Sequence, residues 1–252
     1  ILSIDSSLGT QVAVVDTAET AGLPGTCSVQ VLSQAEQADT RRHAESLGQM
    51  LSEALSAPCV ADRPLDAVVA ATGPAPFTGL RAGLVTARVV GRTRGIPVHG
   101  VSSLDAVARL ALDELGARQG EKDPVVLVAT DARRREVYAA LFRANGPDNV
   151  TRLTEISVCP PAQVAECIAV QTPEQGSGAV SIDAVAGSGA ALYPELAEMA
   201  SYQKALAPVS GDALTQVRIA LARLERGEEL STQPLYLRHA DVQMPAARKR
   251  VH

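Results

Sequence analysis

The feature of this 252-residue sequence that most constrains its fold is an order of strands and turns that occurs twice. With Asp5 placed over Asp131, the segments ILSIDSSLGTQVAVV and VLVATDARRREVYAAL show the same arrangement. Each has an apolar strand that ends in Asp, a turn, and a second apolar strand that begins seven residues after that Asp. Self-similarity of this kind is typical of a duplicated structural unit. We therefore expect two similar lobes.

Residue patterns predict the elements of each lobe. In the first half we expect strands at 1–5, 11–16, 28–34, 65–73 and 97–101, and helices at 41–57, at 78–94 and from about residue 103. In the second half we expect strands at 124–131, 135–142, 150–158 and 184–189, and helices at 161–169 and 212–226. We place the lobes at residues 1–104 and 105–252, and leave open that the helix at 212–226 returns to the first lobe.

Composition limits the classes of function. The net charge is -5, which argues against a protein that holds nucleic acid by its overall charge. Aromatic residues make up 2% of the chain and Trp is absent, so a base-stacking surface is not expected. The four cysteines form no C-x-x-C pair and are expected to be free thiols. Because no apolar run approaches the roughly 20 residues that span a bilayer, we expect a cytoplasmic protein without membrane contact.

A stripe of small residues marks the helix predicted at 78–94. Gly79, Gly83, Ala87 and Gly91 recur every four residues and so share one helix face. Glycine inside a helix costs up to roughly 1 kcal/mol relative to alanine, so three glycines need a compensating contact. That contact is either a partner helix or the protein's own sheet, and the spacing leaves both open. The preceding G-P-A-P loop is not a Walker motif, because no Lys follows either of the first two glycines.

Five motifs stand in order along nearly the whole chain: ILSIDSS, ATGPAPFTGLRAGLVTARVVG, PVHGVSSLDAVA, ATDARRREVYAALF and PLYLR. Together they resemble the bacterial TsaB (YeaZ) family. The resemblance implies an α/β, two-lobed actin-like ATPase (ribonuclease H-like) fold with a duplicated β-β-β-α-β-α order. It also implies a non-catalytic scaffold in tRNA threonylcarbamoyladenosine modification. The implied partners are a TsaD-type transferase, a TsaE-type ATPase, and tRNA through the complex.

The resemblance further implies that the first two helices dock the TsaD-type transferase. On this basis the small-residue stripe becomes the favoured docking face, and three residues of the preceding helix complete it. The predicted interface consists of Leu47, Met50, Ala54, Gly79, Gly83, Ala87 and Gly91. Whether the isolated chain forms a homodimer through the same helices stays open.

Nucleotide binding is a second candidate, because the first hairpin wraps phosphates in the actin-like superfamily. Small residues there let backbone N–H groups approach a phosphate. The residues assigned to a vestigial nucleotide site are Asp5, Ser6, Ser7, Gly9 and Thr10. The second hairpin instead carries Arg133, Arg134 and Arg135, where the superfamily has a tight glycine-rich turn. We expect a decayed ATP cleft, with a turn-supporting role for Asp5 as the alternative.

Metal and nucleic-acid contacts complete the candidates. TsaD-type relatives hold a metal with two histidines one helical turn apart, whereas His43, His99, His239 and His252 form no such pair, so we predict no metal. Arg133 to Arg135 and the basic tail at 248–250 are candidate contacts to tRNA phosphates, with solvated surface as the alternative.

The alternative functions are an autonomous ATPase or phosphotransferase, and a glycoprotease-like hydrolase.

Overall fold

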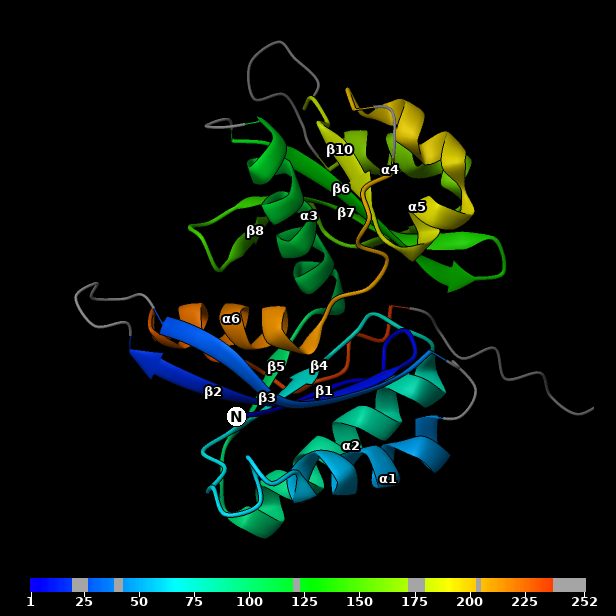
Figure 1. Cartoon of the computed structure of the whole chain (residues 1–252). Helices are drawn as coiled ribbons and strands as arrows, with labels where there is room; N and C mark the ends of the chain where they lie inside the picture. The colour runs from blue at the N-terminus through cyan, green and yellow to red at the C-terminus, as the bar shows by residue number, and fades with distance from the viewer. Residues whose placement is uncertain (20–26, 39–42, 120–122, 172–179, 203–204, 238–252) are drawn as a thin grey trace, which may run out of the picture.

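The computed structural model describes residues 1–19, 27–38, 43–119, 123–171, 180–202 and 205–237. It has two β-sheets, with helices between them and on their outer sides (Figure 1). No helix within these ranges is both long and apolar enough to cross a bilayer. The basic tail at 248–250 and two of the four histidines lie outside the described residues.

The first sheet has the strand order β3-β2-β1-β4-β5. Its strands are β1 (Leu2–Asp5), β2 (Thr10–Glu19), β3 (Cys27–Gln37), β4 (Val68–Ala71) and β5 (Val98–Val101). β1, β2 and β3 pair antiparallel, whereas β1, β4 and β5 pair parallel. Helices α1 (His43–Ser56) and α2 (Phe77–Arg94) cover one face, and their apolar side chains form a core with Leu2, Ile4 and Val12.

The second sheet has the order β10-β6-β7-β8, and β9 also pairs with β7. Its strands are β6 (Val125–Arg133), β7 (Glu136–Ala144), β8 (Val150–Arg152), β9 (Ser157–Cys159) and β10 (Ala184–Ala186). Helix α3 (Ser103–Gln119) packs on one face against Val126, Val128 and Phe142. The other face is covered by η1 (Pro161–Gln163), α4 (Val164–Ala169), α5 (Ser188–Leu192) and η2 (Pro194–Met199).

Helix α6 (Ala213–Leu224) follows the second sheet in the chain but packs on the first sheet. Its buried Val217 and Ile219 lie in one core with Ala13 and Val69 of the first sheet. Asp212 caps the start of the helix, and its carboxylate accepts a hydrogen bond from the Thr215 N–H at 2.7 Å. Figure 1 shows α6 between the first sheet and α3, so the last described helix completes the first lobe.

The small-residue stripe of α2 faces the first sheet. Gly79, Gly83, Ala87 and Gly91 are all buried. A Cβ at position 83 would collide with the Ser6 hydroxyl, and one at position 91 with the side chain of residue 98 in β5. The glycines therefore let α2 lie close to its own sheet. Of the two contacts that the spacing left open, the structure shows the helix's own sheet, and contact of this buried stripe with a partner remains a prediction.

The three interface residues predicted on α1 are also buried in the chain. Leu47, Met50 and Ala54 are 2%, 6% and 1% exposed and belong to the core between α1, α2 and the first sheet. Their helical spacing correctly indicated one buried face. That face is filled by the chain itself, so any partner of these helices must use their opposite sides.

Candidate functional site

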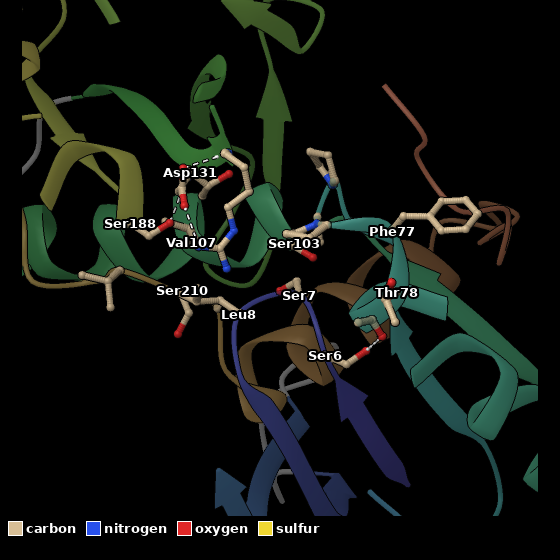
Figure 2. A pocket seen from close by; sticks show the side chains of 18 residues that line it. Ser6, Ser7, Leu8, Phe77, Thr78, Ser103, Val107, Asp131, Ser188 and Ser210 are labelled. Atoms are coloured by element: carbon tan, nitrogen blue, oxygen red, sulfur yellow. Dashed lines mark hydrogen bonds and ion pairs between the residues drawn. The ribbon is translucent and has the colours of Figure 1, made fainter. Parts of the chain in front are cut away.

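A pocket with a volume of about 240 Å³ lies between the two lobes (Figure 2). The first lobe contributes the β1–β2 hairpin and the loop that leads into α2, and the second lobe contributes the β6–β7 hairpin. The polar side chains on its wall are Ser6, Ser7, Thr78, Ser103, Thr130, Asp131, Arg133, Ser188 and Ser210. Asp131 is the one acidic side chain among the described lining residues.

The first hairpin is organised by Asp5, which is 4% exposed. One carboxylate oxygen accepts a hydrogen bond from the Ser7 N–H at 2.7 Å, and the other accepts one from Gln216 Nε2 at 2.6 Å. Burial raises the pKa of the Asp5 carboxyl, although the hydrogen bonds from Ser7 and Gln216 oppose the rise. Asp5 thus holds the turn and does not line the pocket, whereas its neighbours Ser6 and Ser7 do.

Ser6 ties this hairpin to α2. Its hydroxyl donates a hydrogen bond to the Gly79 carbonyl oxygen at 2.8 Å and accepts one from the Gly83 N–H at 3.1 Å. Gly9 has φ of 69°, in the left-handed region that favours glycine. Gly9 and the buried Thr10 lie outside the pocket wall. Of the five residues assigned to a nucleotide site, the structure brings two to the pocket.

The second hairpin repeats the arrangement of the first with a different turn. The Asp131 carboxylate accepts a hydrogen bond from the Arg133 N–H at 2.8 Å and forms an ion pair with the Arg133 guanidinium at 3.4 Å. The Asp131 N–H donates to the Ser188 hydroxyl at 3.0 Å, which connects the hairpin to the start of α5 (Figure 2).

Three consecutive arginines form the second turn. Arg133, Arg134 and Arg135 have φ of 64°, 53° and 61°, and Arg133 pairs with Glu136, which leaves a two-residue connection. Positive φ at both central positions is typical of a type I′ hairpin turn, where Asn and Gly are preferred. The bulk of the arginines had suggested that a tight turn would not form here, but the structure has one. The arginines make it in a strained conformation.

The described residues include no group of three or more His, Cys, Asp and Glu side chains placed to hold a metal ion. Burial lowers the pKa of His99, which lies on β5. The side chain of His43 is outside the described part of the structure, so the predicted absence of a metal remains a prediction for the whole chain.

A second candidate site is the outer side of α2, opposite the buried stripe. Val85 and Val89 are 55% and 57% exposed and lie one turn apart. Phe77 is 49% exposed at the start of the same helix, and the Arg81 guanidinium lies 4.8 Å from the centre of its ring. We call Phe77, Val85 and Val89 the α2 ridge. Sequence reasoning missed this ridge because it gave weight to the small residues on the other side.

The segment from Leu230 to Leu237 runs beside the same helix. The Leu230 carbonyl accepts a hydrogen bond from the Gly100 N–H, and the Leu235 N–H donates to the Thr72 carbonyl at 2.9 Å. The ring of Tyr236 lies 4.8 Å from that of Phe77. The PLYLR motif thus places an aromatic side chain against the start of α2.

Comparison with known proteins places this geometry in a family. The family model TsaD, described as tRNA N6-adenosine threonylcarbamoyltransferase, matches residues 30–220. The chain belongs to the TsaD family. An uncharacterized protein of Mycobacterium tuberculosis is 42% identical over 134 residues, which are 52% of this chain and 58% of that protein. A tRNA N6-adenosine threonylcarbamoyltransferase of Rhizobium johnstonii is 30% identical over 121 residues, 44% of this chain and 33% of the enzyme.

The TsaD family member described here therefore matches less than two thirds of the length of these relatives. Among solved structures, YeaZ from Pseudomonas aeruginosa has a TM-score of 0.66 at 23% identity, with 94% of this chain and 98% of YeaZ covered. This likeness shows the fold. The expected two-lobed α/β fold and the expected family resemblance are confirmed at that level.

Proposed function

We propose that this chain is a TsaB-type, non-catalytic subunit that activates a TsaD-type transferase in tRNA threonylcarbamoyladenosine modification. The observation that carries the proposal is the α2 ridge in a member of the TsaD family whose fold is that of YeaZ. The proposed partner surface is thus the outer side of α1 and α2, and not the buried stripe.

The chemistry of the ridge suits a protein partner. Val85 and Val89 are exposed one turn apart, and the ring of Phe77 is exposed at the start of the same helix. Together they offer apolar area that a partner helix can bury. On α1, a Cβ at Gly48 would meet nothing within 4 Å, so this neighbouring helix leaves open space for close approach. Arg81 adds a cation beside the ring, and arginine is enriched in protein interfaces.

A supporting role fits the first hairpin better than catalysis does. In the superfamily the hairpin Asp acts on metal-bound water, but Asp5 is buried and held by Ser7 and Gln216. This supports a subunit that has kept the fold while its partner performs the transfer. A TsaE-type ATPase and tRNA would join through the complex in the cytoplasm, with the exposed arginine turn at 133–135 as the proposed tRNA contact.

The experiment is a light-scattering mass of the chain, alone and mixed with the TsaD-type transferase of the same organism. We expect a heterodimer with the native chain and at least about a tenfold loss of affinity for the double variant Val85→Asp, Val89→Asp, because two charges would be buried without partners. The control is Val170→Asp, at a valine that is 77% exposed in the second lobe. It should bind like the native chain.

Other outcomes separate the remaining possibilities. Binding that resists the double substitution would place the docking face elsewhere. A homodimer of the isolated chain that the same substitutions dissolve would show that the ridge is self-complementary. If no heterodimer forms under any condition, the scaffold proposal fails. ATP turnover by the chain would then be measured, because the pocket lies between the two hairpins as expected for an autonomous ATPase.

A further inference from the structure

Two cysteines of the second lobe meet at a place that neither the pocket nor the α2 ridge includes. Cys159 ends β9, and Cys167 lies on α4, the helix that packs against this strand. Cys159 is 4% exposed and belongs to the core between α4 and the second sheet. Cys167 packs against the same core but keeps part of its surface exposed. Both are free thiols.

The strand and the helix that carry the two cysteines are held together. η1 and α4 follow β9 directly in the chain. Beyond the end of α4, the Gln171 side chain donates a hydrogen bond from Nε2 to the Ser157 Oγ at 2.7 Å, which ties this end of the helix back to β9. The side chains at positions 159 and 167 therefore face each other across a fixed strand–helix contact.

The two thiol groups also interact with each other. Burial raises the pKa of the Cys159 thiol to about 12, and a hydrogen bond and the electrostatic influence of Cys167 add to the rise. Two cysteines whose side chains already meet satisfy the main geometric requirement for a disulfide, because their Cβ atoms then point toward each other. A pair of this kind differs from the exposed Cys59, which has no described cysteine beside it.

Burial gives the two thiols different roles. The thiolate is the reactive form of cysteine, and at neutral pH the Cys159 thiol is almost entirely protonated as well as shielded from reagents. Cys167 is the thiol of the pair that a reagent in solution can reach. Dithiols that are strong oxidants owe this to a stabilised reduced form. The Cys159 thiol has no such stabilisation as a thiolate, which favours the disulfide once it has formed.

From this arrangement we propose that Cys159 and Cys167 are a reversible redox site, which closes to an intramolecular disulfide by exchange with a low-molecular-weight disulfide. The Cys167 thiolate attacks one sulfur of the reagent, which releases one thiol and leaves a mixed disulfide on Cys167. The Cys159 sulfur then attacks the Cys167 sulfur, and its proton passes to the second thiolate that leaves. The two cysteines lose two electrons, and the reagent disulfide is reduced to two thiols.

The experiment equilibrates the whole chain with mixtures of reduced and oxidised glutathione, folded and in urea. Remaining thiols are then blocked with N-ethylmaleimide, and the chain is cut by a protease that cleaves after glutamate. Glu166 lies between the two cysteines, so their disulfide links two peptides that separate on reduction. We expect an equilibrium constant for the disulfide at least about tenfold higher in the folded chain than in urea, because the fold holds the two thiols in contact.

Cys59→Ser is the matched control, because Cys59 is a free thiol outside the pair. It should leave the equilibrium constant unchanged. Cys159→Ala should stop the reaction at the mixed disulfide of Cys167 with glutathione, which mass spectrometry detects on the Cys167 peptide. Cys167→Ser should leave Cys159 without glutathione in the folded chain, because Cys159 is buried.

Three results would overturn the inference. The first is a folded chain that yields no linked peptides even in the most oxidising mixture. The second is an equilibrium constant in the folded chain no higher than in urea, which would show that the fold keeps the thiols apart. The third is glutathione on Cys159 in folded Cys167→Ser, which would contradict the assigned roles. None of these depends on the partner protein, so the inference and the docking proposal fail separately.

Discussion

The two hairpins at the facing ends of the lobes share one hydrogen bond at their aspartates, in two different surroundings. In the first, Asp5 pairs across the strands with Gln11, and in the second Asp131 pairs with Val137, six residues later in each case. In both, one carboxylate oxygen accepts the N–H of the residue two positions on, at 2.7 and 2.8 Å. The local geometry of the duplicated unit has been retained in both lobes.

The hairpins differ in what engages the second carboxylate oxygen. At Asp5 it accepts from Gln216, a fully buried side chain of α6, whereas at Asp131 it meets the half-exposed guanidinium of Arg133. The first turn is also fixed by the Ser6 hydroxyl, which is hydrogen-bonded to the backbone of Gly79 and Gly83 on α2. The shared hydrogen bond is thus made by neighbouring residues in both hairpins, whereas the further support of the first hairpin comes from α6 and α2, far away in the chain.

The largest expected effect comes from breaking the support of the first hairpin. Gly83→Leu should destabilise the chain by about 3 kcal/mol or more, because the added side chain meets Ser6 and the first sheet. The control is Gly48→Leu on α1, where a Cβ has open space and leucine is the better helix former. Urea unfolding should show a large loss for the first and none for the second. An equal change in the free energy of unfolding for the two variants would mean that the contact between Ser6 and α2 does not fix the hairpin.

A smaller effect compares the two carboxylate partners. Gln216→Ala should cost about 2–3 kcal/mol, since it leaves Asp5 buried without its side-chain donor and opens a cavity. Arg133→Ala should cost less than about 1 kcal/mol, because exposed ion pairs contribute little. The measurement is again the free energy of unfolding in urea. Similar losses at both hairpins would contradict the contrast drawn between them.

The smallest expected effect is a gain in stability from substitutions in the turn of the second hairpin. Replacing Arg134 by Asn and Arg135 by Gly should stabilise the chain by about 1 kcal/mol, because these residues adopt positive φ readily. The control is Arg92→Gly on the exposed side of α2. This variant should lose up to about 1 kcal/mol of stability, because glycine is unfavourable in a helical conformation. A loss of stability in the turn variant would show that the arginine side chains hold the hairpin.

Much of this comparison could be read from the sequence. The overlay of Asp5 on Asp131 located both turns, and the apolar runs located the strands around them, because both signals are local. The sequence placed the small-residue stripe on one helix face, and the neighbour of that face in the structure is the first sheet. Spacing by four shows that Gly83 and Gly91 share a face, yet nothing in it tells a partner helix from the helix's own sheet.

The other features of the site could be found only from the three-dimensional structure. Gln216 is 211 positions from Asp5 and carries no pattern that links it to the first hairpin. Ser103 was predicted only as the start of a helix, and its place on the pocket wall depends on how the two lobes meet. The α2 ridge could have been found from Val85 and Val89, since they fall between the small residues on the helix. The prediction overlooked them because exposed valines are common in soluble proteins.

The position of α6 has a consequence for how the chain acquires its structure during synthesis. The face of the first sheet that holds Ala13, Val15 and Val69 is covered by residues 213–224, which leave the ribosome after the entire second sheet. The second lobe therefore has all its strands available while the older part of the chain still lacks a layer. The N-terminal lobe is the last to be completed, and a truncation before residue 213 would leave its sheet with an uncovered, aggregation-prone surface.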